Sequence, residues 1–212
     1  YRNLRHSLGH VDEEKGHSWE IGFAGDRVNG KTYPKLWGTY DAGLQLPIRH
    51  SSLWLRTTAG WTRRVEGEPF ASFYFGAFGN NWVDDRPEKR YRELLSFPGV
   101  EIDEVPGSNF GRAMLEWTLP PIRFREAGTA DFYVSWVRPA VFASVLGTNV
   151  DSEKGLATDA ARHVVENVGA QVDFRIFMLS RLEMTLSFGQ AWAFEAHRAS
   201  RSETMVSLKI LK

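Results

Sequence analysis

The chain contains no cysteine, which excludes disulfide frameworks, thiolate zinc sites and cysteine nucleophiles. Its formal net charge is zero, so no electrostatic footprint points to nucleic acid. No stretch approaches the roughly 18 consecutive apolar residues of a transmembrane helix. Gly-x-Ser-x-Gly, P-loop and Gly-x-Gly-x-x-Gly motifs are missing as well. We therefore expect no nucleophile elbow, phosphate cradle or cofactor, and no enzyme.

Aromatic residues are abundant, with 8 Trp, 14 Phe and 6 Tyr in 212 residues. Several of the tryptophans lie near the ends of apolar segments, namely Trp19, Trp61, Trp82 and Trp192. Trp and Tyr favour the interface between membrane and water, where one side of the ring is apolar and the other is wet. The aromatic pattern therefore favours a membrane-embedded protein.

Alternation of apolar and polar residues with a period of two is the strongest signal in the chain. In residues 168–176, the apolar side chains fall on one face of a strand and Gly169, Gln171, Asp173 and Arg175 fall on the other. The same alternation predicts nine strands, at residues 19–24, 39–46, 52–60, 72–77, 112–119, 130–146, 168–176, 182–195 and 206–210, with a partial strand within 1–8. Arg138 and Pro139 blur the pattern and predict a bulge or the exit of that strand from the membrane.

Long strands with one apolar and one polar or small face are typical of a transmembrane β-barrel, with lipid outside and a polar lumen inside. We therefore expect an all-β, antiparallel transmembrane β-barrel over residues 1–212. The alternative is a soluble β-sandwich, but its strands average about 5–6 residues, and nearly all of the strands expected here are longer. The chain offers no convincing amphipathic helix beyond a short one at 153–165.

The connections between the expected strands sort into two sets. Counting back from the end, one set holds residues 197–203, 148–162, 79–109, 47–51 and 11–16, and the other holds 179–181, 120–129, 63–69 and 26–34. The first set contains the two longest connections. Short periplasmic turns and longer extracellular loops are the rule in barrels, so we expect the first set to be extracellular.

Two motifs carry a resemblance to a known family: Phe-Tyr-Phe-Gly-Ala-Phe-Gly at 73–79 and, after a long loop, Gly-Ser-Asn-Phe-Gly-Arg-Ala-Met-Leu-Glu-Trp-Thr-Leu-Pro-Pro at 107–121. From Phe70 onward the chain resembles the C-terminal half of the barrel in the BamA/TamA-like outer-membrane assembly factors, the bacterial surface-antigen superfamily. The resemblance implies a barrel of about 16 strands, with upstream strands and periplasmic domains outside this chain. It also implies a long loop that folds into the barrel and is locked to the wall.

The resemblance implies where that lock would lie. The family's loop tip carries Arg-Gly-Phe or Arg-Gly-Tyr, and here the nearest equivalent is 96–100, with Phe97 and Gly99 but no Arg. Glu116 matches the wall carboxylate of the family, whereas residues 140–144 lack the expected Asp. We therefore expect the lock to be altered or absent.

Charges of both signs fall on the polar face of the expected strands: Asp41, Arg56, Arg112, Glu116, Asp173, Arg175, Glu183 and Lys209. Such charges pair across a small lumen, anchor an inserted loop, or line a water-filled pore. We favour pairing with the 79–109 loop. The candidate lumen and lock residues are thus Phe97, Gly99, Arg112, Glu116, Asp173 and Arg175.

Other polar residues support no site of their own. His6, His10 and His17 lack the cysteine or spaced carboxylates of a metal centre, and we interpret them as solvated loop residues at an extracellular rim. Asp84 and Asp85 could join His50 in a rim catalytic site, but the run 84–90 is more simply a solvated loop. No catalytic or metal-binding residue is therefore expected.

Two functions remain open from the sequence. One is a bacterial outer-membrane assembly factor for insertion or export of proteins, in contact with lipopolysaccharide or phospholipid and with client outer-membrane proteins. The other is a non-enzymatic barrel that anchors or scaffolds other envelope proteins. The missing loop Arg favours the scaffold, and the strand order with Glu116 favours the assembly factor.

Overall fold

The computed structural model describes residues 1–8, 11–63, 65, 68–79, 89–125, 127–129, 131–150, 162–179 and 182–211. The short helix expected at 153–165 lies outside the described residues except for its end, which is strand. In the described part of the chain, the regular structure is β-strand apart from two single-turn 3₁₀ segments, η1 (Pro69–Ala71) and η2 (Arg90–Arg92). None of the described helices is long and apolar enough to cross a membrane.

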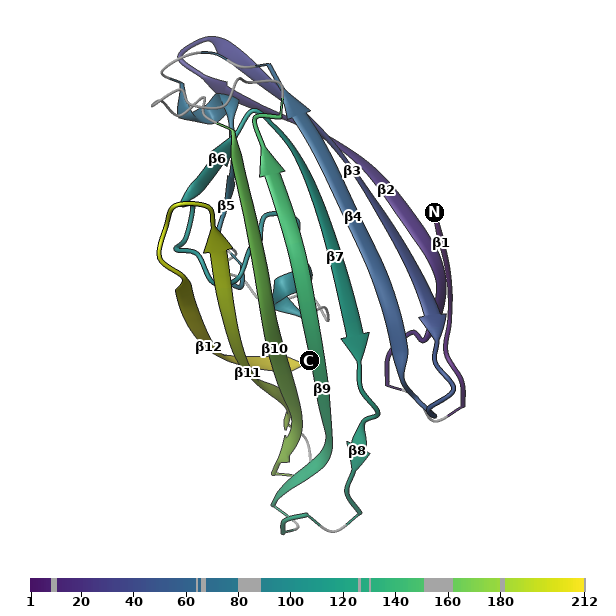
Figure 1. The fold of residues 1–212 in the computed structure, drawn as a ribbon. Coiled ribbons are helices and arrows are strands. Elements are labelled where there is room, and N and C mark those ends of the chain that lie inside the picture. Colours follow the sequence, from purple (N-terminus) through teal and green to yellow (C-terminus); the bar gives the residue numbers. More distant parts are fainter. Residues whose placement is uncertain are drawn as a thin grey trace.

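One long antiparallel sheet contains ten of the described strands (Figure 1). Its order is β1 (Arg2–Arg5), β2 (Lys15–Val28), β3 (Lys31–Gln45), β4 (Ser52–Thr62), β7 (Asn109–Thr118), β9 (Phe132–Thr148), β10 (His163–Met178), β11 (Leu182–Glu195) and β12 (Arg201–Leu211), with β8 (Ile122–Arg123) beside β9. Within the described residues no pairing joins β1 to β12, so the sheet is open and curved. The all-β antiparallel fold is therefore established, whereas closure into a barrel is not.

The strand expected at residues 72–77 is not part of the main sheet. Residues 73–75 form the short strand β5 (Phe73–Phe75), which pairs with β6 (Val105–Gly107) in a separate two-stranded sheet. The rings of Phe73 and Phe75 pack edge-on against Phe110 of β7, with centroids 4.9 and 4.6 Å apart. Residues 73–75 alternate like a strand of the main sheet because one face of β5 is buried. That apolar face packs on other protein side chains and not on the outside of the sheet. β4 therefore pairs directly with β7.

Because residues 72–77 are not a strand of the main sheet, the connections that precede them in the chain lie at the opposite end of the sheet from the one expected. Antiparallel order puts connections 6–14, 46–51, 119–131 and 179–181 at one end of the sheet, the turn end, and 29–30, 63–108, 149–162 and 196–200 at the other, the loop end. The expected grouping was thus wrong for 11–16 and 47–51, which lie at the turn end, and for 26–34 and 63–69, which lie at the loop end. Both of the longest connections still leave from one end.

The bulge expected at Arg138 and Pro139 is also misplaced. β9 runs through both residues, and its register with β10 shifts between Arg175 and Ile176, opposite residues 134–136. The carbonyl of Pro139 accepts from Leu119 N, one residue past the end of β7. The missing N–H of Pro139 therefore faces the point where the neighbouring strand stops, a position that a sheet tolerates.

The two faces of the sheet have the opposite polarity to those of a water-soluble protein. Large apolar side chains are exposed on one face, including Ile21 (70%), Leu44 (70%), Trp192 (45%), Val206 (64%) and Leu208 (56%). The other face buries polar residues, among them Glu116, Thr118, Asn167, Gln171 and Asp173. An exposed apolar face over this many strands is far beyond the scattered apolar residues of an ordinary soluble surface.

The concave, polar face is covered by the long connection between β4 and β7. We call its described part, residues 68–79 and 89–108, the inserted segment (Figure 1). It packs its aromatic side chains with wall residues into two apolar clusters: Phe73, Phe75, Phe97, Val100, Val105, Phe110, Leu146, Val165 and Ala193, and Phe78, Tyr91, Met114, Ala140, Phe142, Ala191 and Met205. The segment therefore shares a packed core with the wall.

Candidate functional site

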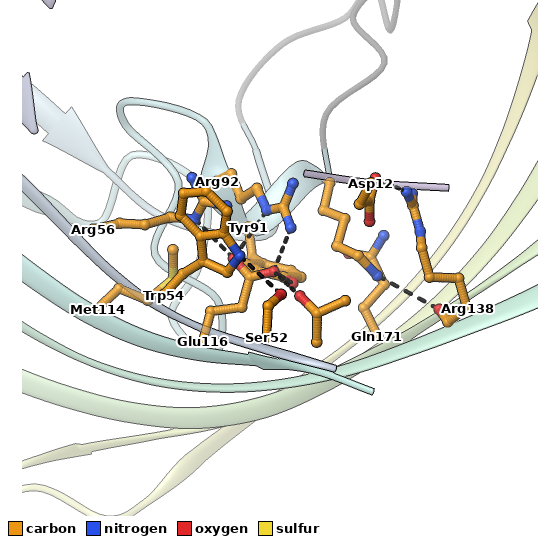
Figure 2. A network of polar contacts seen from close by, with 12 residues as sticks. Asp12, Ser52, Trp54, Arg56, Tyr91, Arg92, Met114, Glu116, Arg138 and Gln171 are labelled. Carbon is orange, nitrogen blue, oxygen red and sulfur yellow. Dashed lines mark hydrogen bonds and ion pairs between the residues drawn. The ribbon is translucent and has the colours of Figure 1, made fainter. Parts of the chain in front are cut away.

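Glu116 on β7 is the centre of the contact between the inserted segment and the wall (Figure 2). Its side chain is fully buried, and Arg92 of the segment donates to both carboxylate oxygens, with Nε 2.9 Å from Oε2. The hydroxyl of Tyr91 donates to Oε1 at 2.9 Å. A buried carboxylate needs partners of this kind, and the segment supplies two of them.

The wall supplies the remaining partners of Glu116. Arg56 on β4 donates to Oε2 at 2.8 Å, and its other arm donates to Asp41 of β3 at 2.9 Å. The guanidinium of Arg56 lies over the ring of Trp54, 4.9 Å from its centroid. Two carboxylates and two guanidiniums, those of Arg56 and Arg92, therefore form a neutral cluster at the base of the segment.

The turn that carries Tyr91 is held by Arg112. Arg112 lies four residues before Glu116 on β7, on the same face of the sheet. Arg112 donates to the carbonyls of Tyr91 at 2.6 Å and Glu93 at 3.0 Å. The hydroxyl of Ser96 donates to the same two carbonyls. The ring of Tyr91 stacks on Phe142 of β9, 4.2 Å between centroids. Burial first, and then the charge of Glu116, raise the pKa of Tyr91, so that its phenol stays a donor.

Asp173 on β10 is the centre of a second polar cluster. Lys89 of the segment lies 3.0 Å from Oδ2, and Arg138 of β9 lies at 3.0 Å from the same oxygen. Gln171 and Ser187 each donate to Oδ1 at 2.7 Å. Lys89 is buried, and this burial lowers its pKa to about 8 although the charge of Asp173 acts in the opposite direction. The interpretation of 84–90 as a solvated loop is thus wrong for Lys89; Asp84 and Asp85 lie outside the described residues.

The tip of the segment contacts β11 and β12. Gly99 has φ of +97°, and a Cβ placed on it would lie 2.7 Å from the backbone nitrogen of Ala193, so only glycine fits this approach. The backbone N–H of Gly99 donates to Glu203 at 3.0 Å, and the N–H of Phe78 donates to the other oxygen of Glu203. The carbonyl of Pro98 accepts from Asn167 at 2.7 Å.

Five of the six candidate residues take part in the contact between the inserted segment and the wall: Phe97 and Gly99 from the segment, and Arg112, Glu116 and Asp173 from the wall. Arg175 does not: it pairs with Glu183 on the neighbouring strand. Lys89, Tyr91, Arg92 and Glu203 were missed by the sequence argument. The run Lys-Arg-Tyr-Arg at 89–92, basic and aromatic in a loop expected to fold inward beside wall carboxylates, is the signal that points to the first three, and it gives no indication of Glu203.

The inserted segment is therefore bonded to Glu116 through Arg92 and Tyr91. The guanidinium comes from Arg92, upstream of the 96–100 stretch in which the loop tip was expected. Residues 140–144 contribute no carboxylate, and besides Glu116 the wall carboxylates of Asp173 and Glu203 contact the segment.

A cavity of about 820 Å³ lies between the segment and the inner faces of β1–β4 and β7. Trp37, Trp54, Leu94, Glu20 and Asp41 are among the residues that line it. In the part of the chain that the structure describes, no group of three or more His, Asp or Glu side chains is arranged to hold a metal ion.

The histidines lie at strand ends and in connections. His50 in the 46–51 turn contacts the buried carboxylate of Glu14 at 3.2 Å, and His163 contacts Glu195 at 2.9 Å. His6 begins the 6–14 connection at the turn end, and His17 lies in β2 just after it. The expectation that this region lies with the longest loops is thus wrong, and His10 lies outside the described residues.

A comparison of the chain with protein-family models, curated proteins and solved structures gave no match in any of the three.

Proposed function

We propose that this chain forms part of the wall of a transmembrane β-barrel in the bacterial outer membrane, with the inserted segment inside its lumen. The support is the polarity of the two faces. The apolar face suits the acyl chains of phospholipid or lipopolysaccharide, and the buried polar face suits a filled lumen. Closure would come from further strands, about 16 in all by the family resemblance.

Within that barrel, we propose a role in the insertion or export of proteins, as in the BamA/TamA-like assembly factors. The observation that carries this proposal is the contact of Arg92 and Tyr91 with Glu116. It supplies a guanidinium to the wall carboxylate that the resemblance singles out. The missing arginine at 96–100 no longer favours a scaffold, because Arg92 of the same loop reaches Glu116.

The scaffold function keeps one observation in its favour. The segment is held at its base by Glu116 and Asp173 and at its tip by Glu203 and Asn167, as a permanent plug would be. The two functions differ in one outcome. Loosening the segment changes the folding of client proteins if the protein is an assembly factor, and leaves it unchanged if the protein is a scaffold.

Membrane integration is tested by gel migration of the full-length protein with and without boiling. A folded barrel in detergent migrates faster than the boiled chain, and an identical migration would contradict the barrel. Extraction of isolated outer membranes with urea gives a second test: an integral barrel stays in the pellet.

The assembly role is tested with proteoliposomes that hold the full-length protein. We expect them to accelerate the folding of an unfolded outer-membrane protein delivered by a periplasmic chaperone, and we expect Glu116→Gln to slow that folding. Glu183→Gln is the matched control, because Glu183 pairs with Arg175 away from the segment. Equal client folding with and without the protein would favour the scaffold.

A further inference from the structure

Two connections that enter from opposite ends of the sheet meet at one pair of wall residues. Asp12, in the connection between β1 and β2 at the turn end, is bonded to Arg138 of β9 (Figure 2). Lys89 arrives with the inserted segment from the loop end and lies 3.0 Å from Asp173 of β10. Arg138 and Asp173 are direct neighbours across β9 and β10. The four side chains thus form a continuous ionic chain in the order Asp12, Arg138, Asp173, Lys89.

The four groups are withdrawn from water. The side chains of Asp12 and Arg138 are 14% and 10% exposed, and those of Asp173 and Lys89 are 2% and 0% exposed. Screening by solvent and salt is weak at such positions. Charge on one member of the chain is therefore felt by the others.

The chain is neutral only when both connections are in place. The two carboxylates balance the two cations. The connection at the turn end brings the carboxylate of Asp12, and the inserted segment brings the ammonium group of Lys89. Without the charge of Asp12, Arg138 and Lys89 share the single carboxylate of Asp173, and their mutual repulsion is uncompensated. Without Lys89, Arg138 is left between two carboxylates. Each connection thus changes the electrostatic environment in which the other one docks.

We propose that this ionic chain couples the two ends of the sheet. The connection at the turn end stabilises the docked inserted segment, and displacement of Asp12 by a partner at that end loosens the segment around Lys89. Coupling of this kind is reciprocal, since the same free energy acts in both directions. The inference rests on the wall and its contacts, and it holds whether the protein is an assembly factor or a scaffold.

The position of Asp12 is fixed independently of the segment. Glu14, two residues later, is 1% exposed, accepts from the N–H of Ser7 at 2.7 Å and contacts His50 of the neighbouring 46–51 turn. Glu14 is therefore held by β1, where its backbone N–H donates to the carbonyl of Arg5, and by the 46–51 turn, without the help of Asp12. A change at Asp12 alone removes its charge from the chain and leaves this anchor intact.

Residues 1–212 contain no cysteine, so a thiol introduced among them can be followed by labelling and identified by its peptide. A single cysteine at Leu94→Cys, next to the base of the segment, reports its release in the full-length protein in detergent. We expect Asp12→Asn to raise the labelling rate about tenfold, within the usual range of coupling between sites. Glu13→Gln is the matched control, because Glu13 pairs with the exposed Arg2, and it should leave the rate unchanged.

Two further measurements separate coupling from loss of fold. Val100→Cys lies in the apolar cluster at the tip of the segment, and its labelling should not rise with Asp12→Asn. In the reverse direction, Lys89→Met should raise the labelling of Ser7→Cys by a similar factor. An unchanged rate at Leu94→Cys, an equal rise at Val100→Cys, or no effect of Lys89→Met at Ser7→Cys would each overturn the proposal.

Discussion

Replacing Glu116 by Gln should release the inserted segment from the wall. The carboxylate of Glu116 is buried and serves Arg92, Tyr91, Arg56 and Thr118 together. Glutamine keeps the size and one acceptor oxygen, so the cavity and the packing stay the same. What it removes is the negative charge between two guanidiniums, and what it adds is a donor amide facing them.

The magnitude follows from what remains paired. Arg56 keeps Asp41, so the uncompensated charge is mainly that of Arg92, whose side chain is 11% exposed. Removing one partner of a buried pair costs about 3–5 kcal/mol. Since undocking lets Arg92 reach water, we expect about 3 kcal/mol to favour the released segment, which is roughly a hundredfold change in its population.

Trypsin cleavage after Arg92 measures that population, with the site identified by mass spectrometry. Cleavage requires the residue to leave the wall, so its rate follows the equilibrium of release when docking is fast. We expect Glu116→Gln to be cut about two orders of magnitude faster than the parent protein, and Glu183→Gln to match the parent. A parent-like rate for Glu116→Gln would refute the assignment of Glu116 as the residue that holds the segment.

Three other outcomes follow from the same structure. Gly99→Ala should destabilise the fold by about 1–3 kcal/mol, because the added Cβ meets the backbone of Ala193 at a strained φ, and the temperature of the gel-mobility shift should fall; an unchanged temperature would contradict the close approach. Release of the segment should become less favourable as pH rises between about 8 and 10.5, by about 2 kcal/mol from pH 8 to 9.5, because the docked Lys89 binds its proton less tightly (pKa about 8) than the released one. Tryptic cleavage after Arg92, normalised to an unfolded substrate, should fall over that range, whereas Lys89→Met should show no such trend. Leu208→Arg on the apolar face should cost about 2–4 kcal/mol of folding free energy in lipid vesicles, measured by denaturant titration, and an undiminished stability would contradict contact of that face with lipid.

The strands of the main sheet were predictable because their signal is local. Period two is visible in any window of a few residues, and the strands expected at 168–176 and 182–195 match β10 and β11. The partial strand within 1–8 is β1. The error at 72–77 has a physical cause: alternation records that one face is buried, but it does not record which part of the molecule covers that face.

The partners of the polar wall residues were only half predictable. The alternation put Glu116 and Asp173 on the inner face, and chain length made an inward loop conceivable. Which loop residue meets which carboxylate depends on contacts between residues 24 and 84 positions apart, as with Arg92 to Glu116 and Lys89 to Asp173. No local pattern encodes these distances, so Arg92 could not be paired with Glu116 in advance.

The inverted polarity of the sheet has a consequence for how the protein is handled. In an alternating chain, the apolar residues are separated from one another by polar ones, so an extended, unpaired strand has no continuous greasy surface. That surface exists only once neighbouring strands have paired and placed residues such as Phe188 and Val206 side by side. The species most prone to aggregate in water is therefore the paired sheet, and not the unfolded chain. Detergent or lipid therefore has to be present while the strands pair. If it is added later, the apolar faces of different molecules have already aggregated.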